Sequence, residues 1–244
     1  NPEKVISALK KLNDGKSDTS SKYTSHLAVA AVHAFHEKYD QTILPLKAAA
    51  TLKPNWILNY YLLAAVYQSL DREDDVIASL KKAVQFRPEE FYTHWILGYA
   101  YETSGQKQEA ITSYNKAIRV SPDIFFSYAV LGDLYRKLGQ YQEAITQYKV
   151  ALRIKPNLAV LHNDLGRVYS KLGHNDKAIA QYKEALIEPE IQSFPHHDLA
   201  RKNLESLLES KSEHSPAPVY TAEDKMKLDT ILRAFEKSKL KISD

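Results

Sequence analysis

The chain has 244 residues, of which 44% are apolar and 26% charged, and it carries no cysteine. This composition is typical of a folded protein and excludes a disordered chain, a disulfide framework, thiolate metal sites and thiol nucleophiles. The 33 basic and 30 acidic side chains leave a formal charge of +3, which gives no electrostatic reason to expect a nucleic acid partner. No run of 18 apolar residues occurs and the first 30 residues lack a signal-peptide pattern, so we expect no membrane span and no signal peptide in the chain as given, and localisation stays unknown.

The first predicted element is an amphipathic helix near the start of the chain. Val5, Ile6, Leu9 and Leu12 lie on one helical face, and the polar stretch 13–22 follows as a linker. We interpret residues 1–22 as a half-repeat or capping helix plus this linker, because the apolar spacing copies that of helices further along. A half-repeat at Asn1 also suggests a segment of a longer protein, and a capping helix is the alternative.

Residues 23–192 repeat with a period of 34. Proline recurs at this spacing four times, at Pro54, Pro88, Pro122 and Pro156. A fixed spacing of this size indicates a solenoid built from one supersecondary unit rather than a single closed core. The predicted units are 23–56, 57–90, 91–124, 125–158 and 159–192.

Each unit contains two stretches with the apolar spacing of an amphipathic helix. The eighth position is always small, which lets the second helix approach closely: it holds Ala30, Ala64, Gly98, Gly132 and Gly166. In the last three units a glycine between the two helices predicts a left-handed turn, at Gly105, Gly139 and Gly173. The first unit has no such glycine and carries Pro45 inside its second helix, so we expect a kink near Leu44 and Pro45.

This pattern of large-x-x-Leu-Gly-x-x-Tyr, then Ala, an aromatic residue, Ala and Pro, resembles the tetratricopeptide repeat (TPR) family over residues 23–192. The resemblance implies an all-α fold, a right-handed α-solenoid of antiparallel helix pairs with helical caps (a TPR superhelix). It also implies a module that binds proteins.

Beyond the repeats, two further helices are predicted. Residues 193–211 form a C-terminal capping helix with five apolar residues on one side: Leu199, Ala200, Leu204, Leu207 and Leu208. Residues 212–244 form a linker and a terminal amphipathic helix, which begins with a capping box at Thr221 and Asp224. Its apolar stripe, Leu228, Ile231, Leu232 and Phe235, needs a surface on its own solenoid or on another chain.

No catalytic pattern stands out. The sequence has no phosphate-binding glycine loop, nucleophile elbow or haem-attachment motif. His26, His33 and His36 could share a helical face as metal ligands, but core positions are the better interpretation. We therefore expect no enzyme activity, no metal and no cofactor.

The resemblance implies that positions 2, 5, 6, 9, 12 and 13 of each unit line a concave groove. Its first half is aromatic and aliphatic, with Leu58, Tyr61, Leu62, Tyr92, Trp95, Tyr99 and Phe126. Its second half is polar and counts a local charge of +2, with Asp133, Arg136, Lys137, Asn163, Asp164, Arg167 and Lys171. Large exposed aromatic patches usually mark interaction sites, so Trp95→Ala should weaken binding with little change in melting temperature. The alternatives are that some aromatic side chains pack between helices, or that the stripe of residues 228–235 fills the groove.

The groove residues disfavour the carboxylate clamp by which some family members hold an acidic chaperone tail. Its Lys, Asn and Arg positions are occupied by other residue types, namely Tyr61, Ala65, Ile96, Phe126 and Val130. We expect a non-catalytic interaction module whose aromatic half takes a protein or peptide segment and whose basic residues favour acidic groups. One alternative is a homo-oligomer scaffold assembled through residues 221–240 in trans, and the other is the regulatory TPR region of a larger enzyme.

Overall fold

The computed structural model describes residues 2–14, 18–187 and 194–214, and these form twelve α-helices with no strand among them. The predicted all-α class is confirmed. The chain divides into two compact units, Asn1–Ile154 and Lys155–Asp244, which are described separately. Within the described ranges, no helix has the length and apolar character needed to cross a membrane.

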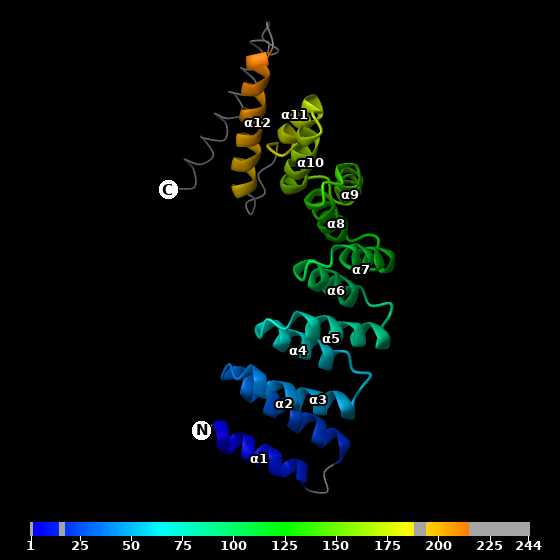
Figure 1. Ribbon diagram of the computed structural model, residues 1–244, viewed down its shortest axis with the longest axis vertical. Helices are drawn as coiled ribbons and strands as arrows, with labels where there is room; N and C mark the ends of the chain where they lie inside the picture. The colour runs from blue at the N-terminus through cyan, green and yellow to red at the C-terminus, as the bar shows by residue number, and fades with distance from the viewer. Residues whose placement is uncertain (1, 15–17, 188–193, 215–244) are drawn as a thin grey trace. The chain divides into compact units, whose positions relative to one another are not determined.

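The first unit is a solenoid of helix pairs in which each helix contacts the next along the chain (Figure 1). Because these contacts are local in sequence, one pattern repeated along the chain is enough to build the whole unit. Its helices are α1 (Pro2–Asp14), α2 (Thr19–Phe35), α3 (Tyr39–Leu52), α4 (Leu58–Ser69), α5 (Glu73–Phe86), α6 (Phe91–Thr103), α7 (Lys107–Val120), α8 (Phe125–Lys137) and α9 (Tyr141–Ile154).

Glycine and tyrosine pack against each other inside the helix pairs. A Cβ atom added to Gly98 would lie 2.6 Å from Cδ1 of Tyr114, and one added to Gly132 would lie 2.9 Å from Cδ1 of Tyr148. Both tyrosines are almost completely buried. The close approach predicted from the eighth position is therefore present, and the ring of the facing tyrosine takes the space a side chain would need.

The left-handed turn recurs every 34 residues whether or not glycine occupies it. Gly105 and Gly139 each have φ of 75°, as their position predicts, and Glu37 and Asp71 have φ of 57° and 54° at the corresponding places. The sequence did not mark these two turns because neither carries glycine. The repeated feature is the backbone geometry, since each turn has to return the chain antiparallel to the preceding helix.

Replacing the left-handed aspartate with glycine should stabilise the fold. Asp71→Gly removes a Cβ atom that is unfavourable at positive φ, and we expect the free energy of unfolding to rise by about 1 kcal/mol. Gly105→Ala is the matched control, because an added Cβ there meets nothing within 4 Å and acts only through the backbone. Urea denaturation of both variants measures the effect, and a loss of stability in Asp71→Gly would show that its side chain is needed.

The start of the first unit differs from the prediction at one point. The expected linker 13–22 is shorter, because α1 continues to Asp14 and α2 already begins at Thr19. Asp18 makes this early start favourable, since its Oδ1 accepts a hydrogen bond of 2.6 Å from the backbone N–H of Ser21. Helix α3 runs from Tyr39 to Leu52 with Pro45 inside it, so a kink there stays a prediction.

The second unit consists of α10 (Ala159–Lys171), α11 (Asn175–Glu184) and α12 (Phe194–His214). Helix α12 contacts both other helices and buries Ala200 and Leu204, as expected of a cap. Leu199, predicted for the same stripe, is 40% exposed instead. The predicted terminal helix and its stripe lie outside the described residues.

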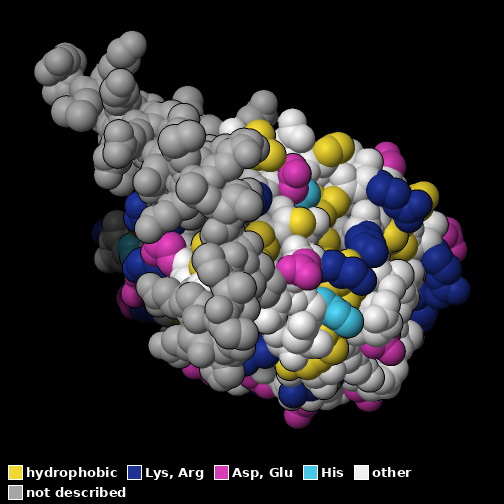
Figure 2. All heavy atoms as spheres, turned by 90° about the horizontal axis from the view of Figure 1, so that it is seen from above, with side chains coloured by type: hydrophobic (Ala, Val, Ile, Leu, Met, Phe, Trp, Pro, Cys, Tyr) yellow, Lys and Arg dark blue, Asp and Glu magenta, His cyan; other side chains and the backbone are white. Residues whose placement is uncertain are grey.

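Figure 2 views the molecule from the end at which α11 and α12 lie in Figure 1. On the coloured part of this face, Lys and Arg side chains are interspersed with Asp and Glu side chains and with hydrophobic ones. The mixture matches the nearly balanced charge of the chain.

Candidate partner-binding surface

An exposed aromatic cluster lies on α6 and α8, and we call it the aromatic surface: Tyr92, Trp95, Tyr99 and Phe126. The first three are spaced i, i+3 and i+7, so they share one face of α6. Trp95 stacks on Tyr99 with ring centroids 6.3 Å apart, and its ring centroid lies 5.5 Å from that of Phe126 on the next helix pair. Tyr92 is 64%, Tyr99 52% and Phe126 46% exposed, so the cluster presents three rings to solvent.

Helix α4 adds two exposed leucines on one face, Leu58 and Leu62, which are 44% and 36% exposed. The other aromatic residue predicted on this helix, Tyr61, is only partly exposed and packs against the hydrophobic core. The hydrophobic side chains of α4, α6 and α8 that sequence analysis selected are therefore accessible, with two exceptions, Tyr61 and Trp95.

Trp95 belongs to both the surface and the core. Its side chain is partly exposed, yet it packs against the buried cluster of this unit. Its indole Nε1 is buried and has no hydrogen-bond partner among the described residues. The alternative that some groove aromatics pack between helices applies to this residue, which both supports Tyr99 and Phe126 and holds the helices together.

The hydroxyl of Tyr61 forms hydrogen bonds within a polar cluster at the start of α6. It donates to Oε2 of Glu90 at 2.9 Å and lies 2.5 Å from Oγ1 of Thr93. Glu90 also caps α6, because its Oε2 accepts from the backbone N–H of Thr93. Burial, together with the Glu90 carboxylate, raises the pKa of Tyr61 to about 12. Sequence analysis missed Glu90 and Thr93, and this cluster means that the Tyr61 hydroxyl positions helices rather than a ligand.

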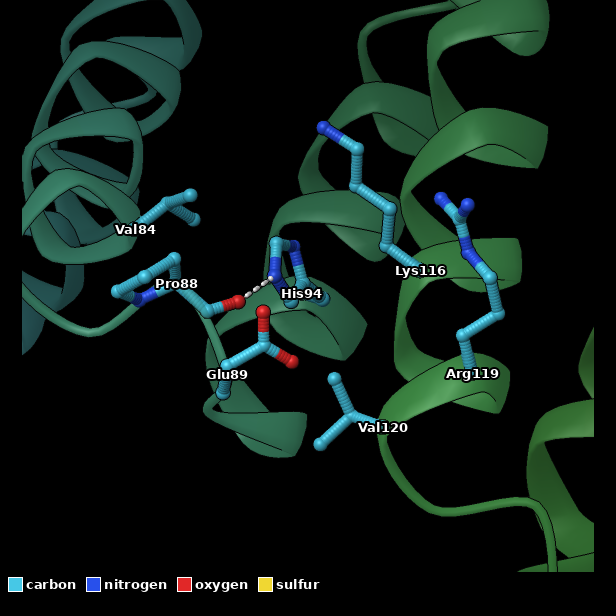
Figure 3. A pocket seen from close by; sticks show the side chains of 7 residues that line it. All are labelled: Val84, Pro88, Glu89, His94, Lys116, Arg119 and Val120. Atoms are coloured by element: carbon cyan, nitrogen blue, oxygen red, sulfur yellow. Dashed lines mark hydrogen bonds between the residues drawn. The ribbon is translucent and has the colours of Figure 1, made fainter.

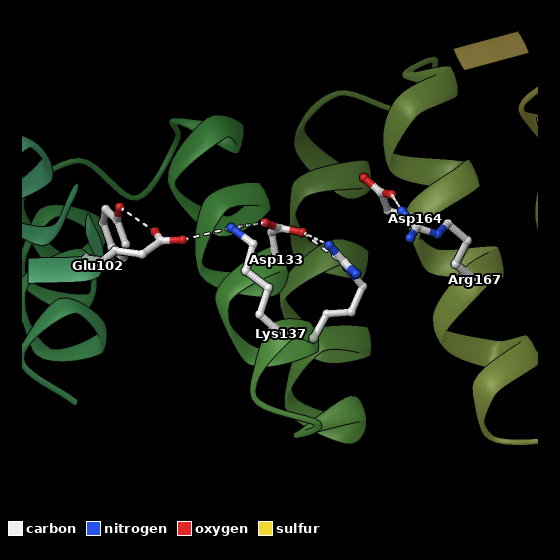
Figure 4. A network of polar contacts seen from close by, with 7 residues as sticks. Glu102, Asp133, Lys137, Asp164 and Arg167 are labelled. Atoms are coloured by element: carbon white, nitrogen blue, oxygen red, sulfur yellow. Dashed lines mark hydrogen bonds and ion pairs between the residues drawn. The ribbon is translucent and has the colours of Figure 1, made fainter. Parts of the chain in front are cut away.

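The predicted excess of positive charge is absent from the first unit. Figure 4 shows Lys137 between Glu102 and Asp133, with Nζ 2.9 Å from a carboxylate oxygen of each. Arg136 forms an ion pair with the same Asp133. Glu102, which the groove count omitted, also accepts a hydrogen bond of 3.1 Å from the buried hydroxyl of Tyr114. Two cations thus face two carboxylates, so the charges at this end of the surface balance.

This network should make stability depend on pH. Burial acts to raise the pKa of Asp133, but hydrogen bonds from Lys137 and Arg136 outweigh it and hold the pKa below its ordinary value. The ionised carboxylate therefore stabilises the fold above the unfolded pKa of about 4, and this contribution is lost as the pH falls through the lower folded value. We expect Asp133→Asn to cost about 0.5 to 1 kcal/mol at pH 7 and clearly less at pH 3. Urea denaturation at both pH values tests this, with the exposed Asp123→Asn as control, and a pH-independent difference would be the wrong outcome.

The remaining predicted groove residues lie in the second unit. Asn163 was wrongly placed on an accessible surface, because it is 1% exposed and its Oδ1 accepts a hydrogen bond of 3.0 Å from Asn203 of α12. Arg167 is paired with Asp164 at 3.3 Å, as Figure 4 shows, and Lys171 is exposed. Asn163, which the repeat pattern predicted to face a ligand, instead accepts a hydrogen bond from helix α12.

The part of the chain that the structure describes contains no group of three His, Asp or Glu side chains able to hold a metal ion. His26, one of the three histidines weighed as ligands, has a pKa lowered by burial.

Comparisons with known proteins agree on the repeat. Residues 59–90 and 92–124 match one family model described as tetratricopeptide repeat, 113–146 match a second with that description, and 132–173 match a model described as TPR repeat. No curated protein sequence matches the chain. Among solved structures, one of the MamA protein is 24% identical, with a TM-score of 0.61 over 82% of this chain and 100% of that one.

Two further structures are similar. Another structure of MamA is 25% identical over 71% of this chain and 97% of its own, with a TM-score of 0.59. YrrB, described as a TPR protein with an unusual peptide-binding site, is 18% identical over 80% of this chain and 96% of its own, with a TM-score of 0.60. These similarities support the same solenoid of helix pairs.

Proposed function

The chain is a tetratricopeptide repeat protein, a scaffold for protein–protein interaction, and we propose that it binds a protein or peptide segment on the aromatic surface of α6 and α8. The observation that carries this proposal is the exposure of Tyr92, Tyr99 and Phe126 around the partly buried Trp95. Aromatic side chains supply much of the binding energy at interfaces, and a rigid cluster loses little entropy on binding. YrrB is described as having a peptide-binding site, and we propose the same kind of ligand for this chain.

The partner segment should be apolar rather than acidic. Two of the cations predicted for the groove, Arg136 and Lys137, are already paired with Asp133 and Glu102. The exposed leucines Leu58 and Leu62 on α4 add apolar area. We therefore propose an amphipathic helix or extended segment with large apolar side chains as the ligand.

A photo-reactive side chain tests where the partner binds. Benzoylphenylalanine at Tyr92 or Tyr99 of the full chain should cross-link a protein in cells of the source organism. The same group at Phe35, an 84% exposed aromatic residue outside the aromatic surface, is the matched control. The proposal predicts a product that depends on the first two positions, and an identical product from all three would count against it.

Self-assembly and a regulatory role in a larger enzyme stay predictions, and residues 221–240 lie outside the described residues. Light scattering over a concentration series separates self-assembly from partner binding. If the chain is a receptor, its mass should stay that of a monomer with and without residues 212–244. A larger mass that is lost on truncation would instead favour the homo-oligomer scaffold.

A further inference from the structure

A cavity of about 410 Å³ lies between α5, α6 and α7 of the first unit, apart from the aromatic surface (Figure 3). It is lined by apolar, basic and acidic side chains together with one imidazole: Val84, Pro88, Glu89, His94, Lys116, Arg119 and Val120. Its size suits a small organic molecule or the end of a peptide.

His94 lines this cavity and carries a buried ring nitrogen without a partner. The side chain is 4% exposed, and its Nε2 lies 2.6 Å from the carbonyl oxygen of Pro88, as the dashed line in Figure 3 shows. A carbonyl can only accept a hydrogen bond, so Nε2 carries the proton. The other ring nitrogen, Nδ1, is buried and has no partner among the described residues. A buried ring nitrogen without a hydrogen bond destabilises the folded state.

The same register elsewhere in the chain shows how this nitrogen can be satisfied. His162, two repeats later, also reaches a proline carbonyl, with Nε2 2.8 Å from the oxygen of Pro156. Its Nδ1, however, lies 2.9 Å from the side-chain oxygen of Gln181. The residue in the position of Gln181 beside His94 is Ser113, which has the shorter side chain. The open nitrogen is therefore a property of this repeat and not of the fold.

The pair of basic side chains in the lining is absent from the next repeat. Lys116 and Arg119 lie one turn apart on α7, are exposed, and form no ion pair with any described residue. The corresponding positions of the next repeat hold Val150 and Arg153, so the pair does not recur there. Glu89 is the one carboxylate of the lining, which leaves an excess of one positive charge beside the apolar walls.

We propose that this cavity binds an organic carboxylate with a short apolar body, either a free small molecule or the carboxyl terminus of a peptide. The apolar body would contact Val84, Pro88 and Val120, and the carboxylate would face Lys116 and Arg119. A single negative charge matches the charge excess of the lining, and the apolar walls disfavour a strongly hydrated phosphate.

The ring of His94 lies in the lining, so it reports whether the cavity is occupied. Its Nδ1 is buried, so the carboxylate would be held by Lys116 and Arg119 and not by this nitrogen.

NMR titration of the full chain tests the site through the ring resonances of His94. Pentanoate should shift them saturably, whereas pentanamide should not and inorganic phosphate should do so far more weakly. A peptide ending in valine with a free carboxyl group, compared with its amide, distinguishes the two sources: binding at least tenfold tighter than pentanoate identifies a peptide terminus. No saturable shift with either carboxylate, or equal binding of phosphate, would overturn the proposal.

A double variant places the binding in the cavity. Lys116→Ala with Arg119→Ala removes exposed side chains and should weaken pentanoate binding at least tenfold, while Arg153→Ala is the control from the same register. Unchanged affinity in the Lys116 and Arg119 double variant would refute the site.

Discussion

Gly98→Ala should destabilise the protein by about 2 kcal/mol, and Tyr114→Leu in the same chain should remove much of that loss. The new Cβ atom would lie 2.6 Å from the Tyr114 ring, a distance at which something must move. Alanine favours a helix over glycine by about 1 kcal/mol, so a net loss can come only from this overlap. The chain itself suggests the remedy, because earlier repeats combine alanine with leucine at these two positions, as in Ala64 and Leu80.

A double-mutant cycle measures this coupling. Tyr114→Leu alone should also destabilise, since it opens space in the core and removes the hydrogen bond to Glu102. The double variant should lose at least 1 kcal/mol less than the sum of the single variants, as determined by urea denaturation. Gly132→Ala combined with Tyr114→Leu is the control and should be additive. Additive losses for Gly98 and Tyr114 would contradict the pairing.

Trp95→Ala should lower the free energy of unfolding by about 2 kcal/mol, whereas Tyr99→Ala should change it by less than about 0.5 kcal/mol. From sequence alone, Trp95 appeared to be a surface residue whose loss would leave the melting temperature nearly unchanged. Its contact with the core and its buried Nε1 lead to the opposite expectation. Tyr99 is 52% exposed, so its removal tests binding without disturbing packing.

Thermal and urea denaturation of both variants measure the free energy of unfolding and so test this prediction. Trp95→Phe is the matched control, because it keeps an aromatic ring against the core and should recover more than half of the stability lost in Trp95→Ala. Equal stability of Trp95→Ala and the unmodified chain would restore the view of Trp95 as a pure surface residue.

The repeat architecture could be predicted because it rests on residue size and backbone geometry. A small residue at the eighth position and a glycine in the left-handed turn each indicate a helix pair, as Gly98 and Gly105 do. The left-handed turn at Asp71 was not predicted, because a residue other than glycine can adopt that conformation at some cost in free energy.

The site was harder to predict, because exposure depends on neighbours that a repeat pattern does not name. Asn163 occupies a groove position, but the capping helix α12 covers it through Asn203. The repeat pattern predicts Lys137 as a free cation, but in the structure it pairs with Glu102, which lies 35 residues earlier in the chain. The open Nδ1 of His94 could have been suspected by comparing Ser113 with Gln181 in the same register.

The most direct test of the central claim is the affinity of the cross-linked partner, once purified, for three forms of the full chain. Isothermal titration calorimetry should compare the unmodified chain, the Tyr99→Ala/Phe126→Ala double variant and the Phe35→Ala control. If the aromatic surface binds the partner, the double variant should bind at least tenfold more weakly while the control binds as the unmodified chain does. Equal affinity for all three forms would contradict the proposed role of the aromatic surface.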